Sequence, residues 1–261
     1  MSNGEHPSPG DEQQTTPKAE RSEQLRHTSL ALEVLEPGDP RAALARQLEA
    51  EVLEEFFGNT PEELAEEYGD YEAASVFLLM YDREAQKPAG MLRLIRNSPK
   101  GLKTVNDIES DAPGYPWHQS VDEVLERNHL AFDRDRVLDI GTVAIAPDYR
   151  GRRDSSDVSY GLYRGLYTYS RSVDCQAWVG ILDDNFLKYT QEQMGGPFRT
   201  FEGLGSGSYI GSEASTPIYS IIADLPGQAS NAVDQGFYRK CILGEDMPGV
   251  EFPEELDRIR S

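Results

Sequence analysis

Cysteine, histidine and lysine are scarce in this chain. The 261 residues include two cysteines and four histidines, and six of the 25 basic residues are lysines. Two cysteines without a CxxC spacing argue against a disulfide scaffold and against a cysteine metal site. The histidines show no metal-ligand spacing, and two of them lie within the first 27 residues. We therefore expect no metal and a reduced, cytoplasmic setting.

The chain also lacks an excess of basic residues and any long apolar run. The 46 acidic residues outnumber the basic ones and give a formal net charge of −21. Such an acidic surface repels nucleic acid and anionic lipid at long range. No stretch approaches the roughly 18 apolar residues of a membrane-spanning helix, and the N-terminus lacks the apolar core of a secretory signal. The sequence predicts neither a nucleic-acid partner nor a membrane span.

The composition divides the chain into three parts. Residues 1–27 are Pro, Gly, Ser, Gln and charged residues, which predicts a disordered tail. We expect one folded domain over residues 28–225 and a helical C-terminal extension over 226–261. Within the domain, alternating or continuous apolar residues predict strands and 3.6-residue periodicity predicts helices. The strands lie near 28–37, 74–82, 89–97, 136–147, 175–183, 198–204 and 216–225, and the helices near 39–57, 60–72, 120–130, 155–173 and 184–195.

The order of these elements predicts an α/β (α+β) fold with a mixed sheet. Hairpins at both ends surround a single strand–helix–strand unit over 136–183. Gly161 and Gly165 in its helix predict a close approach of that helix to the sheet. The stretch 98–117 shows no periodicity, and we expect it to be irregular. Ligands of α/β sheets bind at the carboxyl ends of such central strands, which directs attention to the turn after residue 145.

That turn carries a family resemblance. Residues 147–152 read Pro-Asp-Tyr-Arg-Gly-Arg, and the later helix contains Asn185 and ends in Gly195 and Gly196 before Phe198. Together with the element order over 28–225, this resembles the GNAT acyltransferase superfamily. The resemblance implies a GNAT-like, mostly antiparallel central sheet flanked by helices. It also implies transfer of an acyl group from acetyl-CoA or a longer acyl-CoA to a small-molecule amine.

The turn departs from the family pattern at two positions. The pattern, placed on Arg150, requires glycine at 153 and a small residue at 155, where this chain has Arg153 and Ser155. A side chain at 153 crowds a phosphate, whereas the arginines offer fork-shaped donors for one. A solvated basic turn before a capped helix is the alternative. The residues assigned to cofactor binding are Val143, Ile145, Arg150, Gly151, Arg152, Arg153, Ser155 and Asn185.

The resemblance also implies two catalytic residues. Asp139, on the central strand, is placed to act as general base, and Tyr189, on the later helix, to act as general acid. Asp139 would otherwise pair with Arg136 or cap backbone. The position of the family's tyrosine falls on Gln191 or Glu192, so the alternative for Tyr189 is a packing role.

One branch of the superfamily matches further residues. Residues 89–109 are similar to autoinducer synthases and N-acyl amino acid synthases, which take acyl groups from acyl carrier protein. The branch's arginine on the central strand is absent, with Thr142 in its expected place. Four basic residues in this segment form a predicted patch for the acidic carrier protein, a solvated strand end being the alternative. They are Arg93, Arg96, Lys100 and Lys103.

The sequence therefore predicts an acyltransferase that moves an acyl group from a phosphopantetheine thioester to an amine. The altered turn and the displaced tyrosine keep a second reading open. In it, the chain is a non-catalytic GNAT-like domain that binds a ligand or a protein.

Overall fold

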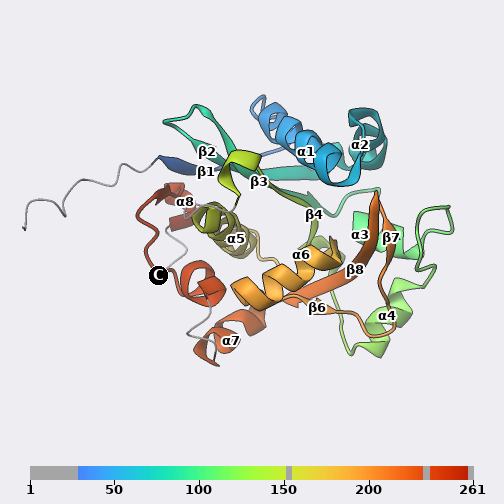
Figure 1. The fold of residues 1–261 in the computed structure, drawn as a ribbon. Coiled ribbons are helices and arrows are strands. Elements are labelled where there is room, and N and C mark those ends of the chain that lie inside the picture. Colours follow the sequence, from blue (N-terminus) through green and yellow to red (C-terminus); the bar gives the residue numbers. More distant parts are fainter. Residues whose placement is uncertain (1–28, 151–154, 232–235, 258–261) are drawn as a thin grey trace, which may run out of the picture.

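The computed structural model describes residues 29–150, 155–231 and 236–257, which fold around one sheet (Figure 1). The strands are β1 (Leu30–Leu35), β2 (Ser75–Asp82), β3 (Lys87–Arg96), β4 (Val137–Ile145), β5 (Ala177–Asp183), β6 (Arg199–Thr200), β7 (Gly207–Tyr209), β8 (Ser212–Ile221) and β9 (Val250–Glu251). The helices are α1 (Ala42–Phe57), α2 (Pro61–Tyr68), α3 (Lys103–Glu109), α4 (Val121–Arg127), α5 (Ser155–Ser172), α6 (Asp184–Tyr189), α7 (Leu225–Asn231) and α8 (Glu254–Asp257).

The sheet is mostly antiparallel, as predicted. Its strands follow the order β6-β8-β5-β4-β3-β2-β1-β9, and β7 pairs with β8. Among the described strands, only β4 with β5 and β1 with β9 run parallel. Helix α5 connects β4 to β5, which confirms the predicted strand–helix–strand unit. The parallel pair therefore lies in the middle of the sheet, with antiparallel neighbours on both sides.

Helices cover both faces of the sheet (Figure 1). Helix α1 packs on one face, where Leu48 and Val52 join apolar side chains of β2, β3 and β4. Helix α5 packs on the other face, where Leu162 and Leu166 enter the largest apolar cluster. Residues from the C-terminal part of the chain, among them Phe237, join that same cluster. The sheet thus separates an α1 side from an α5 side.

Helix α5 lies close to the sheet because of its two glycines, as the sequence predicted. A Cβ at Gly165 would come within 2.5 Å of Leu32 Cδ2, and one at Gly161 within 2.9 Å of Met80 Cε. Both contacts are too short for any larger residue without movement. Val158, Leu162 and Leu166 are fully buried on the same helix.

Two local features show how well short-range signals worked. Thr60 caps α2, with its side chain and that of Glu63 forming a reciprocal capping box and Pro61 following. By contrast, the stretch expected to be irregular contains helix α3, which is a correction to the prediction.

No helix in the described parts of the chain is long and apolar enough to cross a membrane.

Candidate active site

The central feature of the site is a split between β4 and β5. Their pairing ends at Ile140 opposite Gly180, although β4 continues to Ile145 and β5 to Asp183. Strand β5 stays paired with β8 along its whole length, and β4 stays paired with β3 as far as Ile145. The two strands therefore diverge toward their carboxyl ends, and after Ile140 one edge of β4 has no partner among the described strands.

A β-bulge sits where the split begins. The register of β3 and β4 shifts between Arg93 and Leu94, opposite Gly141. A Cβ at Gly141 would lie 3.1 Å from Arg93 Cδ and 3.3 Å from Tyr68 Cε1. Glycine thus allows both side chains to pack over the bulge. The Tyr68 hydroxyl donates to the Gly141 carbonyl at 3.0 Å and lies 3.0 Å from Thr142 Oγ1.

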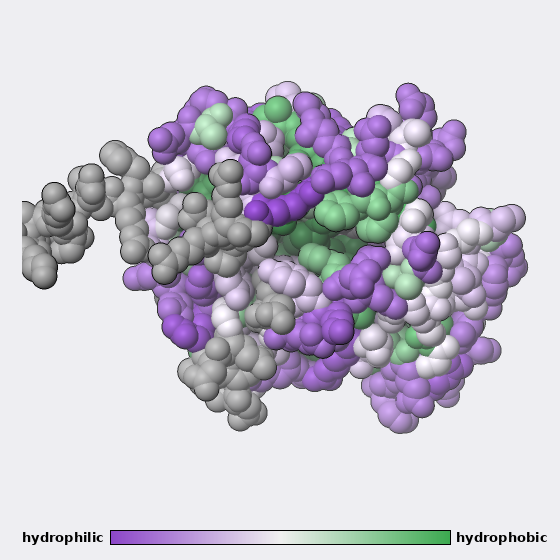
Figure 2. All heavy atoms as spheres, in the orientation of Figure 1, coloured by the Kyte–Doolittle hydropathy of each residue, from purple (hydrophilic) through white to green (hydrophobic). Residues whose placement is uncertain are grey.

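The free edge of β4 presents peptide groups to the split. The Ala146 N–H donates to the Ala89 carbonyl of β3 at 3.0 Å. Because peptide groups alternate in direction along a strand, those of Ile145 and Val143 face away from β3, toward the split. Both residues are half-buried. Figure 2 shows an apolar hollow in this region, between the positions of α1 and α6 in Figure 1.

Arg150 lies at the end of this edge. Its Nε donates to the Ile145 carbonyl at 2.8 Å, and its Nη1 pairs with Glu55 at 2.8 Å. The guanidinium lies 4.6 Å from the centroid of the Phe56 ring. Its Nη2 is buried and has no hydrogen-bond partner in the parts of the chain that the structure describes. Gly151, Arg152 and Arg153 lie outside the described residues, as does the side chain of Ser155, which begins α5.

Asp139 lies at the base of the split, on the α1 side of the sheet. The residue is 1% exposed, and its carboxylate accepts hydrogen bonds from the Thr104 N–H at 2.5 Å and the Thr104 hydroxyl at 2.7 Å. Burial raises the pKa of Asp139 to about 7, although the hydrogen bonds from Thr104 lower it. By accepting these bonds, the carboxylate caps the first turn of α3. This is the backbone-capping role that the sequence offered as an alternative to the role of general base. Arg136 pairs instead with Asp174.

Helix α6 carries the other predicted residues. Asn185 is exposed in the first turn, and Tyr189 ends the helix with 48% of its surface exposed. Leu187 of α6 lies in the same apolar cluster as Leu162 and Leu166 of α5, so α6 packs on the α5 side of the sheet. Tyr189 is thus accessible to solvent and lies beside α5, on the face of the sheet opposite Asp139.

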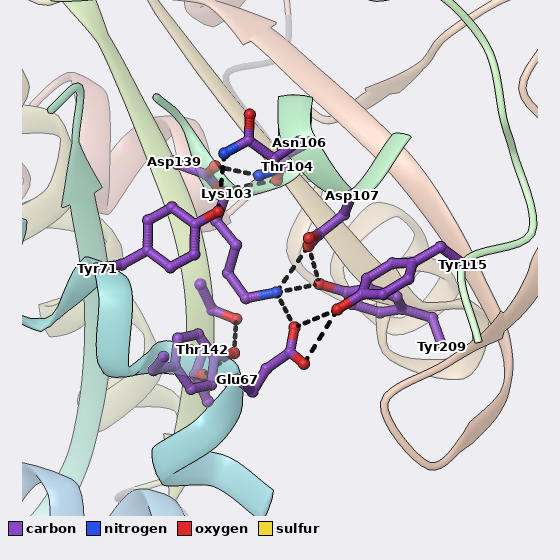
Figure 3. A network of polar contacts seen from close by, with 12 residues as sticks. Glu67, Tyr71, Lys103, Thr104, Asn106, Asp107, Tyr115, Asp139, Thr142 and Tyr209 are labelled. Atoms are coloured by element: carbon purple, nitrogen blue, oxygen red, sulfur yellow. Dashed lines mark hydrogen bonds and ion pairs between the residues drawn. The ribbon is translucent and has the colours of Figure 1, made fainter. Parts of the chain in front are cut away.

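A buried polar network lies next to Asp139 (Figure 3). Lys103 of α3 is 3% exposed and donates to Asp107 at 2.6 Å, to the Tyr209 hydroxyl at 2.7 Å and to Glu67. Tyr115 donates to Glu67 from the segment after α3. Because α3 was not predicted, sequence reasoning missed this network. The Lys103–Asp107 spacing of four residues was the one available signal.

The comparisons with known proteins bear on the fold. No family model and no curated protein matches the sequence. The N-acyl amino acid synthase FeeM from uncultured soil microbes aligns with a TM-score of 0.51 and 13% identity, covering 77% of this chain and 93% of that one. The chain has a GNAT-like fold. The AHL synthase LasI aligns with a TM-score of 0.49 and 16% identity, over 75% of this chain and 91% of that one. The spermidine N-acetyltransferase of Vibrio cholerae, solved with CoA and spermine, aligns with a TM-score of 0.44 and 16% identity, over 75% and 96%.

Within this GNAT-like fold, the predicted residues do not gather at one point. Val143, Ile145 and Arg150 lie together along the split. Asp139 and Tyr189 lie on opposite faces of the sheet, and their catalytic roles remain predictions. Tyr68, which contacts the bulge, was not predicted because nothing near it in the sequence indicates that α2 reaches β4.

The four predicted basic residues do not form one exposed patch, which corrects that prediction. Arg93 and Lys103 are each 3% exposed, because their side chains enter buried ion pairs with Glu49 and Asp107. The two exposed members of the patch are also paired with carboxylates: Arg96 with Glu36 at 2.6 Å and Lys100 with Asp70 at 2.8 Å. In so acidic a chain, the carboxylates of neighbouring elements neutralise these cations.

Proposed function

We propose that this chain is an acyltransferase that moves an acyl group from a phosphopantetheine thioester, on coenzyme A or on acyl carrier protein, to an amine. The split between β4 and β5 carries the proposal. There, the peptide groups of Val143 and Ile145 face an open edge beside an apolar hollow. A phosphopantetheine arm is a linear chain with amide groups, and it can pair with such an edge as an added strand would.

Arg150 supports a phosphate-bearing donor. Two of its guanidinium nitrogens are anchored by Ile145 and Glu55, so the third is held in place. That nitrogen, Nη2, is buried and lacks a hydrogen-bond partner among the described residues. A buried charged donor without a partner is costly, and a phosphate oxygen would satisfy it. These residues therefore fit a pantetheine phosphate at the end of β4.

The proposed chemistry is direct transfer. The amine nitrogen attacks the thioester carbonyl carbon, so that a C–N bond forms and the C–S bond breaks. The amine loses a proton, which Asp139 would accept through the Thr104 hydroxyl; its pKa of about 7 suits a base at neutral pH. The departing thiolate gains a proton, for which the accessible hydroxyl of Tyr189 is the proposed source. The N-acyl amino acid synthase that shares the fold makes acylated amines, as its name states.

A non-catalytic binding domain is the second candidate. One observation favours it: both carboxylate oxygens of Asp139 already accept hydrogen bonds from Thr104, as a purely structural cap would. Such a domain would bind a pantetheine thioester without cleaving it. Release of free thiol from acetyl-CoA in the presence of an amine, lost in Asp139→Asn, would exclude this candidate.

Removing one N–H from the edge of β4 tests the binding proposal. Val143→Pro deletes the peptide N–H that faces the split while leaving the bonds between β4 and β3 intact, because proline is tolerated where a strand has a free edge. We expect acyl-CoA to raise the melting temperature of the wild type and of the control Val143→Ala, but not that of Val143→Pro. An equal shift in all three proteins, or no shift in the wild type at any salt concentration, would contradict the proposal.

A further inference from the structure

A second cavity lies between α1, α2 and the sheet. It has a volume of about 970 Å³, which is within the range of small-molecule sites. Its walls come from α1, α2 and the short segment η1 (Gly69–Ala74), and its floor from β2 and β3. Val143, Ile145 and Arg150 are not among its lining residues. It is therefore a different space from the split, and nothing in the proposed acyl transfer uses it.

Two arginines converge on one carboxylate at the wall of this cavity. Glu72 of η1 accepts from Arg46 Nη1 at 2.5 Å and from Arg93 Nη1 at 2.9 Å. Both guanidinium groups lie against the Phe77 ring, 5.8 and 4.6 Å from its centroid. Arg93 also has a buried counter-ion of its own, since Glu49 accepts two hydrogen bonds from it at 3.0 and 2.6 Å. Glu72 is thus a second carboxylate beside Glu49, and it bridges the two arginines.

Glu72 can leave this position without uncovering an unpaired buried charge. The Arg93–Glu49 pair, with both side chains 3% exposed, would stay neutral by itself. Glu72 and Arg46 are 37% and 43% exposed, so water can solvate either of them. The carboxylate belongs to a six-residue 3-10 segment, a type of helix with poor hydrogen-bond geometry. Movement of Glu72 would free one donor nitrogen, Nη1, of each arginine.

We propose that this cavity binds a small apolar carboxylate, whose carboxylate group replaces that of Glu72 on Arg46 and Arg93. Arg46 Nη1 and Arg93 Nη1 each donate to a different oxygen of Glu72, and the same two donors can take the two oxygens of a ligand carboxylate, which favours an anion here. The remaining lining suits an apolar body, because Leu64, Ala65 and Phe77 contribute to it. Glu72 occupies the site in the free protein and competes with the ligand.

The site also contacts the candidate active site through one side chain. Tyr68 lines the cavity, its ring lies 4.4 Å from the Arg93 guanidinium, and its hydroxyl donates to the Gly141 carbonyl at the bulge. The side chain of Tyr68 alone would therefore separate a ligand in the cavity from the start of the split. The binding proposal itself does not depend on acyl transfer, and a binding measurement tests it whether or not the chain is an enzyme.

The test is isothermal titration calorimetry of the full chain with octanoate, octylamine and methyl octanoate as probes. We expect octanoate alone to bind. Glu72→Gln, which removes the internal competitor, should bind it about tenfold more tightly, and Arg46→Met about tenfold more weakly, as for loss of one charged hydrogen bond. Arg41→Met is the matched control, because Arg41 is as exposed as Arg46 (44% against 43%), pairs with Glu33 and lies outside the cavity. Arg93 is left intact, since its removal would strand the buried Glu49.

Three outcomes would overturn the proposal. Failure of octanoate to bind even Glu72→Gln would show that the arginines are purely structural. Binding of octylamine that is lost in Glu72→Gln would show a cation site in place of an anion site. Equal weakening by Arg46→Met and Arg41→Met would show a general effect of surface charge.

Discussion

At the scale of a single residue, Asp139 links stability to pH. Burial raises its pKa to about 7 in the folded protein, whereas an unfolded aspartate has a pKa of about 3.9. The folded state thus binds the proton more tightly, and this contribution to stability is lost as the pH rises from about 4 through about 7. We expect Asp139→Asn to gain stability relative to wild type over that range, by on the order of 4 kcal/mol. Urea unfolding of both proteins at about pH 4.5 and pH 8 measures the change; a constant difference would contradict it.

The same residue gives the proposed acyl transfer a pH profile. If Asp139 is the base, kcat/KM should rise with pH through about 7, as the carboxylate loses its proton. Thr104→Val removes the hydroxyl that relays the proton and also one of the hydrogen bonds that lower the pKa of Asp139, so kcat/KM should fall and the remaining profile should move to higher pH. A profile unchanged in Thr104→Val, or retained in Asp139→Asn, would leave Asp139 only its role as a cap of α3.

At the scale of the elements, Lys103 holds α2, α3 and β7 together through one ammonium group (Figure 3). Lys103→Met would leave Asp107 and Glu67 as buried or half-buried anions without a cation, which costs about 3–5 kcal/mol of stability in comparable buried pairs. The matched control is Lys100→Met, because Lys100 forms an exposed pair with Asp70 and should contribute nothing measurable. Denaturant unfolding at pH 7 measures both variants. Equal effects of the two substitutions would contradict a special role for the buried network.

The elements also show where sequence reasoning succeeded. The helix that begins near residue 60 and the close-packed glycines of α5 depend on residues within a few positions of each other, so local patterns predicted them. Helix α3 begins at a residue with no side-chain cap of its own, and its N-terminus is held by Asp139, which lies 35 residues later in the chain. The stretch 98–117 around this short helix contains three prolines and two glycines, which obscured the helix in the sequence.

In the candidate site, too, the sequence predicted features set by neighbouring residues and missed features set by tertiary contacts. The edge of β4 around Val143 and Ile145 was predicted because the resemblance fixed the central strand and its turn. Arg93 and Lys103 are not part of an exposed patch because the carboxylates that neutralise them come from α1, α2 and α3, and only the tertiary structure brings α1 and α2 beside β3. Tyr68 and the pair of Arg46 and Arg93 around Glu72 were missed for the same reason.

At the scale of the whole molecule, the net charge of −21 should make stability depend on salt. Like charges repel most in the compact state, and salt shortens the range of that repulsion from about 10 Å at 0.1 M to about 3 Å at 1 M. Surface ion pairs such as Arg83 with Glu251 weaken as salt is added, but the 46 acidic residues exceed the 25 basic ones by 21, so repulsion between carboxylates outweighs these pairs. We therefore expect the melting temperature to rise between these two KCl concentrations and to level off as screening saturates. Sucrose stabilises by exclusion and not by screening, so it should give a steady rise without a plateau. A melting temperature that falls with KCl would show that the surface ion pairs outweigh the repulsion.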